Sequence, residues 1–154
     1  MTLTLDASSL VADGESHWAS VTACNAAHLC VTAISDVISV DSTPPVAGTF
    51  LSPLRWVRET NVSGDVVTSI DVKWRGFSDA ESGVALYRLL AGRDYNGQEV
   101  SGGRVEVSHD KVNVTQRYSL TVREELRSGE LLHLALLAEN TLGLASPLVR
   151  AEFR

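Results

Sequence analysis

Two cysteines and four histidines are the side chains of this chain best suited to metal, redox or nucleophilic chemistry. Cys24 and Cys30 are six positions apart, which is not the CxxC spacing of redox and zinc sites. Segments that alternate apolar and polar residues lie on both sides of them. If these segments pair as antiparallel strands, the cysteines stand at the mouth of the connecting loop, close enough for a disulfide. The alternative is two free thiols that pack as small apolar side chains. The flanking alternating residues are Ala19, Val21 and Ala23 before the pair, and Val37, Ile38 and Val40 after it.

A short acidic stretch is the only other candidate for metal chemistry. Asp79 and Glu81, with Asp71 upstream, could offer carboxylate oxygens to calcium. Calcium usually needs six or more oxygens, and this spacing lacks the ligand density of a dedicated loop. The following Ser82-Gly83 accounts for the stretch equally well as turn chemistry. We therefore assign no metal and no cofactor, and keep Asp79 and Glu81 as weak calcium candidates.

Catalytic groups do not form a recognisable set. No serine or cysteine lies in a nucleophile elbow or a comparable setting. The histidines share no pattern, and each is interpreted as a surface or partly buried strand or loop residue. We expect a protein that is not an enzyme. The four histidines are His17, His28, His109 and His133.

Two N-glycosylation sequons provide evidence about the cellular compartment of the protein. Asn61-Val62-Ser63 and Asn113-Val114-Thr115 both satisfy the N-glycosylation rule and fall in polar stretches. Such triplets also arise by chance in a chain rich in serine and threonine. Together with a loop disulfide they favour the outside of the cell or the secretory lumen.

The elements that must position these residues are all strands. Runs with period two include Ile70 to Trp74, Ala85 to Leu89, Val105 to Val107 and Tyr118 to Val122. Glycine-containing turns separate them. Leu131 to Leu137 is continuously apolar and could be read as a helix, but its counterpart His17 to Ala23 alternates, so we interpret both as strands. This order predicts an antiparallel two-sheet β-sandwich. Its core is expected to hold Trp74, Tyr87, Tyr118, Leu120, Leu134 and Leu136.

The chain carries one element twice. Residues 14–29 (GESHWASVTACNAAHL) align without a gap on residues 129–144 (GELLHLALLAENTLGL), at a constant shift of 115 positions. A repeat at this spacing is typical of like modules in series. We expect residues 1–40 to be the rear part of a preceding module, 41–45 a proline linker, and 46–154 a complete module.

Charge and hydropathy exclude two classes of partner. The net charge is −6 and no basic patch appears that could neutralise a phosphate backbone, so nucleic acid is not expected as a partner. No apolar run approaches the roughly 20 residues that span a bilayer, so direct membrane insertion of this segment is not expected either.

Several sequence motifs resemble those of a known family. Thr43-Pro44-Pro45, then Trp74, Tyr87 and a late strand running into Ala138 to Leu144, are similar to a fibronectin type III module. Trp74 to Val84 (WRGFSDAESGV) resembles the W-x-G-F-x-D-x-E-S-G-I segment of divergent fibronectin-III-like repeats in large secreted or surface proteins. In those repeats a CN-x-A-x-LC loop and a VD-x-TPP linker also recur, here at 24–30 and 40–45.

The resemblance covers essentially the whole chain and departs from the family at one corner. The position of the family's corner tyrosine holds Leu132, and His17 in the first copy. That substitution removes the corner hydrogen bond while leaving the sandwich in place.

The function this implies is a non-catalytic structural or adhesion module that spaces and presents surfaces in an extracellular protein or filament. Its partners would be neighbouring modules of the same chain. One alternative is a ligand-recognition module that binds a protein or glycan through the Cys24 to Cys30 loop or the Glu81 turn. Another is an ancillary module of a secreted enzyme, because function resides in sites and not in the fold.

Overall fold

The chain was analysed as a computed structural model, which describes residues 11–52, 54–60, 62–64, 66–110, 114–122, 127 and 129–154. Every regular element in these ranges is a β-strand, and every strand pairing is antiparallel. The prediction of an all-β protein is therefore confirmed. The chain divides into an N-terminal unit, Met1–Thr43 with Ala80–Ser82, and a C-terminal unit, Pro44–Asp79 with Gly83–Arg154.

The described strands of the N-terminal unit form one long hairpin in two parts. β2 (Ser20–Cys24) pairs with β3 (Cys30–Ile34), and β1 (Ser16–His17) pairs with β4 (Ile38–Ser39). The expectation that the segment at 37–40 pairs with 19–23 is wrong. The tight loop after Cys24 returns the chain at once, so 30–34 lies opposite 20–24 and Ile38–Ser39 meets the earlier Ser16–His17.

One face of this hairpin is apolar, and the other mixes hydroxyl side chains with Ile34 and the cysteine pair. Residues directly opposite in an antiparallel pair project to the same side. Val21 pairs with Ala33, and Ala23 with Val31, so these four side chains share a face. The opposite face carries a Thr22–Thr32 hydroxyl contact of 2.8 Å and the cysteine pair. All ten residues of β2 and β3 are exposed, which means that neither face is covered by a described core.

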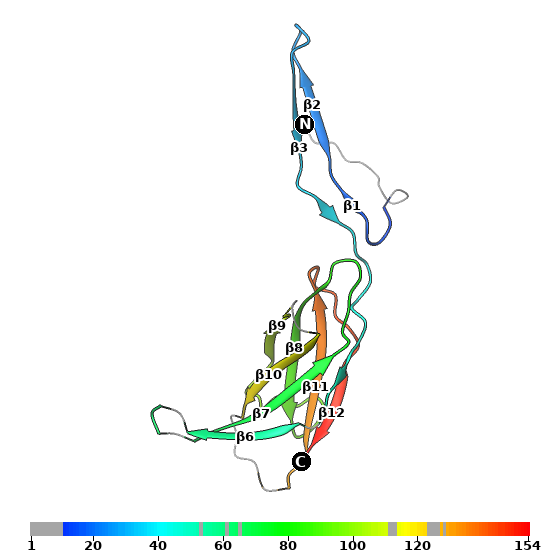
Figure 1. Cartoon of the computed structure of the whole chain (residues 1–154). Coiled ribbons are helices and arrows are strands. Elements are labelled where there is room, and N and C mark those ends of the chain that lie inside the picture. The colour runs from blue at the N-terminus through cyan, green and yellow to red at the C-terminus, as the bar shows by residue number, and fades with distance from the viewer. Residues whose placement is uncertain are drawn as a thin grey trace. The chain divides into compact units, whose positions relative to one another are not determined.

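The C-terminal unit contains two four-stranded sheets (Figure 1). In the first, β7 (Val66–Arg75) is central, pairing with β10 (Thr115–Thr121) on one side and with the shorter β5 (Thr49–Phe50) and β6 (Arg55–Thr60) on the other. In the second, the order is β12 (Val149–Phe153), β11 (Leu132–Asn140), β8 (Val84–Gly92) and β9 (Val105–Ser108). The apolar run at 131–137 is thus strand, as expected.

The two sheets contribute to one hydrophobic core. Trp74 from β7 and Tyr87 from β8 are fully buried and meet edge to face, with ring centroids 5.1 Å apart. This geometry suits the quadrupoles of two aromatic rings. Leu120, Leu134 and Leu136 are fully buried as well, whereas Tyr118 is only partly buried against the same cluster. Leu132 of β11 is also fully buried. The rest of the core consists of Ile70, Val72, Phe77, Val84, Leu89, Ala91, Val100 and Ala138.

Candidate functional site

A disulfide closes the loop at the tip of the β2–β3 hairpin. Cys24 and Cys30 occupy directly opposite positions at the ends of the two strands and are bonded to each other. The predicted pairing is confirmed. A covalent link across so short a loop contributes about 2 kcal/mol on the chain-entropy model, and it indicates an oxidising, extracellular type of environment.

Asn25 organises the same loop from inside. Its Oδ1 accepts from the backbone N–H groups of Ala27 (2.9 Å) and Leu29 (3.0 Å), and its own N–H donates to the Leu29 carbonyl at 3.0 Å. His28 has a φ of 59°, a left-handed conformation that is uncommon for a residue with a Cβ. The loop holds this conformation while presenting Leu29 to solvent.

The C-terminal unit contains the same loop at the equivalent positions after β11. Asn140 Oδ1 accepts from the N–H groups of Leu142 (3.1 Å) and Leu144 (2.8 Å), and the Asn140 N–H donates to the Leu144 carbonyl at 3.0 Å. Gly143, which aligns with His28, also has positive φ. The cysteine positions are held here by Glu139 and Ala145, which form an isolated antiparallel bridge.

The equivalence extends to the turn at the start of each copy. Gly14 and Gly129 have φ values of 81° and 80°. Glu15 accepts from the Ala12 N–H at 3.1 Å, and Glu130 accepts from the Arg127 N–H at 2.8 Å. That backbone bond, aided by the Arg93 guanidinium, lowers the pKa of the Glu130 carboxyl below its usual value. The two stretches that align in sequence therefore have the same local hydrogen bonds.

Strand register is repeated at the two ends of the hairpin, but not between them, where Val21 faces Ala33 and the equivalent Leu136 faces Val149. In the first copy, His17 pairs with Ile38. Adding 115 to both numbers gives Leu132 and Phe153, which also pair with each other. Cys24 opposite Cys30 corresponds likewise to Glu139 opposite Ala145. Sequence reasoning found the repeat but missed the role of the two asparagines. The signal was present, because an asparagine that opens a tight loop commonly accepts from backbone groups two residues on.

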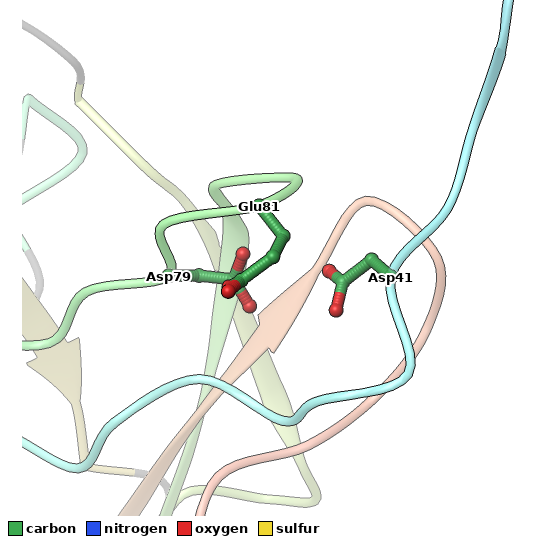
Figure 2. A group of neighbouring side chains, drawn as sticks. All are labelled: Asp41, Asp79 and Glu81. Atoms are coloured by element: carbon green, nitrogen blue, oxygen red, sulfur yellow. The ribbon is translucent and has the colours of Figure 1, made fainter. Parts of the chain in front are cut away.

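The acidic candidates lie on the loop between β7 and β8. Figure 2 shows Asp79 and Glu81 on this loop, and Asp41 on the segment that precedes the prolines. Within the C-terminal unit, Asp79 Oδ1 accepts from the Gly83 N–H at 2.9 Å and Oδ2 accepts from Asn140 Nδ2 at 3.3 Å. These bonds give Asp79 a structural role in its turn. Asp79 and Glu81 stay weak calcium candidates.

Asp71 has a different partner. It is buried on β7, and its Oδ1 accepts from Arg117 Nε of β10 at 2.8 Å. The arginine is exposed while the carboxylate is not. A buried carboxylate needs such a partner because desolvation disfavours its charge. Asp71 therefore serves as an ion-pair residue of the first sheet.

The histidines have separate surroundings. His109 Nδ1 lies 2.8 Å from the Tyr87 hydroxyl, and burial raises the pKa of that hydroxyl above its usual 10.0, an effect that the nearby Trp74 indole partly offsets. His133 packs against the Tyr95 ring at 4.4 Å. Among the described residues, no group of three potential metal ligands includes a histidine.

A shallow hollow of about 400 Å³ lies beside His109. It is lined by Phe77, Ser78, Asp79, Gly83, Val84 and His109. Asp79 and His109 are both engaged by their own unit through Gly83, Asn140 and Tyr87. The lining of the hollow is therefore mixed, and two of its polar side chains are already bonded within the unit.

Both sequon asparagines, Asn61 and Asn113, fall outside the described residues. Their described neighbours Val62 and Val114 are highly exposed. Glycosylation at the two sites remains a prediction.

No protein-family model matches this chain, and a search of curated proteins gives no significant match.

Among the described residues, no helix is long and apolar enough to cross a membrane.

Proposed function

We propose that this chain is a segment of a tandem array of fibronectin-III-like sandwiches, acting as a non-catalytic structural or adhesion module in an extracellular or surface protein. The observation that carries the proposal is the repeated hairpin. Both copies share an asparagine-organised loop, a glutamate-capped turn and the same strand register at the two ends of the hairpin.

Two further features support the spacing role. Paired prolines at Pro44 and Pro45 fix φ, remove amide donors and stiffen the chain where the two units meet in sequence. The C-terminal unit has a core built from both of its sheets, which suits a part that must stay folded while holding its neighbours apart. Neighbouring modules of the same chain are the partners that this role requires.

The disulfide and the two sequons support the proposed extracellular location. A cysteine pair that is oxidised in the folded protein favours secretion, since cytosolic thiols are kept reduced. Protease added to intact cells that make the polypeptide should remove this segment. Its full protection until the cells are lysed would contradict the location.

Stretching the native polypeptide in a force experiment tests the tandem role. Like modules in series should unfold one at a time, with steps of equal length. For a unit of roughly 110 residues, each step should release about 360–400 Å of extended chain, given roughly 3.3–3.6 Å per extended residue. A trace without repeated equal steps would contradict the tandem arrangement.

A second candidate is recognition of a protein or glycan through the Cys24–Cys30 loop. It is favoured by the exposed Leu29 on a loop that the disulfide and Asn25 hold in one shape, because a rigid loop loses little entropy on binding. Binding to a protein or glycan array that disappears in Leu29→Ala, and persists in the matched Leu148→Ala variant, would support it.

A further inference from the structure

The apolar face of the β2–β3 hairpin has a buried counterpart in the C-terminal unit. Val21 and Val31 are 68% and 70% exposed, whereas the residues that align with them, Leu136 and Ser146, are buried. Ala19 and Ala23 are exposed and align with the fully buried Leu134 and Ala138. Ala33 is the exception, because its counterpart Leu148 is 37% exposed. The β2 side chains of this face, together with Val31, therefore have covered counterparts in the C-terminal unit and are open in the N-terminal unit.

The C-terminal unit shows what covers this element. There, β11 pairs along its length with β8, and its inward side chains share a core with Ile70, Val72 and Trp74 of β7. In the N-terminal unit, β2 is the counterpart of β11, and among the described residues it pairs only with β3. The edge that corresponds to the β8 side of β11 is the one that lacks a described strand.

We infer that the open edge of β2 accepts a β8-like strand, antiparallel and in a defined register, supplied by a module of the same kind in the same polypeptide. The inference rests on the tandem arrangement proposed above. The register follows from the 115-residue shift applied to the β11–β8 pairs. The residues equivalent to Leu89, Tyr87 and Ala91 would lie opposite Val21, Ala23 and Ala19, respectively.

The chemistry of the two surfaces agrees with this occupant. Residues 11–40 contain Asp13, Glu15 and Asp36 and no lysine or arginine, whereas Val84–Gly92 contains Arg88 and no acidic residue. A strand of the β8 type thus brings apolar side chains to the apolar face and a positive charge to an acidic hairpin. Burying Val21 and Val31 would remove most of the large apolar surface of that face from water.

The inference can be tested with a fusion in which the sequence of Val84–Gly92 is joined to the N-terminus of the full chain through a flexible linker. The linker keeps the added strand at a high effective concentration near the hairpin. Amide hydrogen exchange, followed residue by residue by NMR, should slow at least tenfold within Ser20–Cys24. Signals of the C-terminal unit should not shift, which would show that the added strand has not replaced β8.

Two matched controls make the result specific. An appended copy in which the positions equivalent to Tyr87, Leu89 and Ala91 are serine, aspartate and serine should give no protection. In the host chain, Val21→Asp should abolish the protection while leaving the C-terminal unit unchanged, because Val21 is exposed in the absence of a partner. Unchanged exchange in the unmodified fusion would overturn the inference.

Self-association is the rival outcome. If sedimentation of the unmodified chain shows dimers, and the same amides are protected on dimerisation, then a second copy is the occupant and the inference is wrong. The stretching experiment is independent of these readouts. Repeated unfolding steps together with unchanged amide exchange in the hairpin would remove only this inference. A protected hairpin without repeated steps would remove the tandem function and, with it, a like module as the source of the strand.

Discussion

Asn140 shows how a single buried polar side chain fixes a loop. Its Oδ1 satisfies two backbone N–H groups while the residue itself is only 2% exposed. Asn140→Ala leaves these donors without their acceptor and should lower the free energy of unfolding by about 1–3 kcal/mol, measured by urea denaturation. Asn25→Ala is the matched control, because it removes the same bonds from the exposed copy. An equal loss of stability of the C-terminal unit in both variants would contradict this account.

Trp74 is the residue whose truncation should be most damaging. It is fully buried and contacts Tyr87 across the core, so Trp74→Ala creates a large cavity. The expected loss is about 3–5 kcal/mol, read from far-ultraviolet circular dichroism during denaturation. Trp18→Ala should leave this transition unchanged, because Trp18 is 62% exposed in the N-terminal unit. A loss under 1 kcal/mol for Trp74→Ala would mean that the first sheet is in a different register.

Tyr87 gives the C-terminal unit a specific response to alkaline pH. Burial raises the pKa of its hydroxyl above 10.0, so the folded state holds the proton more tightly than the unfolded state. Its contribution to stability is complete below about pH 10 and is lost as the pH rises through the folded-state pKa. Tyr87→Phe should lose stability less steeply above pH 10, and with the same slope as wild type between pH 7 and pH 9. If the stability of Tyr87→Phe and of wild type falls with the same slope above pH 10, the prediction is wrong.

At the scale of elements, the disulfide and the loop asparagine act together on the β2–β3 hairpin. In protein secreted into an oxidising medium, Cys24 and Cys30 should resist alkylation until reductant is added, as intact mass would show. Reduction should speed amide exchange in the hairpin, with a loss of about 2 kcal/mol at most. It should leave β11 unchanged, since Glu139 and Ala145 stand at the equivalent positions. Quantitative alkylation without reductant would contradict the pairing.

At the scale of the whole molecule, the two units should differ in resistance to proteolysis. The C-terminal unit buries a core between two four-stranded sheets, whereas the described strands of the hairpin are exposed on both faces. Thermolysin should therefore trim the chain to a resistant fragment that begins between Asp41 and Val46. Trypsin cannot report on this, because the first basic residue is Arg55. Equal protection of residues 11–40 would show that the two copies unfold together.

The sequence by itself determined the strand content, the disulfide and the existence of two copies of one hairpin. Each of these depends on local chemistry. Alternation with period two marks a strand with two unlike faces, and a short loop between facing cysteines permits a bond. Gap-free alignment of residues 14–29 with 129–144 requires no knowledge of the fold.

Only the tertiary structure decided which strands pair and which copy is covered. The sequence favoured Val37 to Val40 as the partner of the 19–23 strand, but Cys30–Ile34 took that place because loop closure is cheapest for the nearest segment. Val21 and Leu136 have equivalent places in the repeat, yet one lies in solvent and the other in a core. Their burial depends on strands far away in the sequence, β7 and β8, and local pattern carries no information about whether such partners are present.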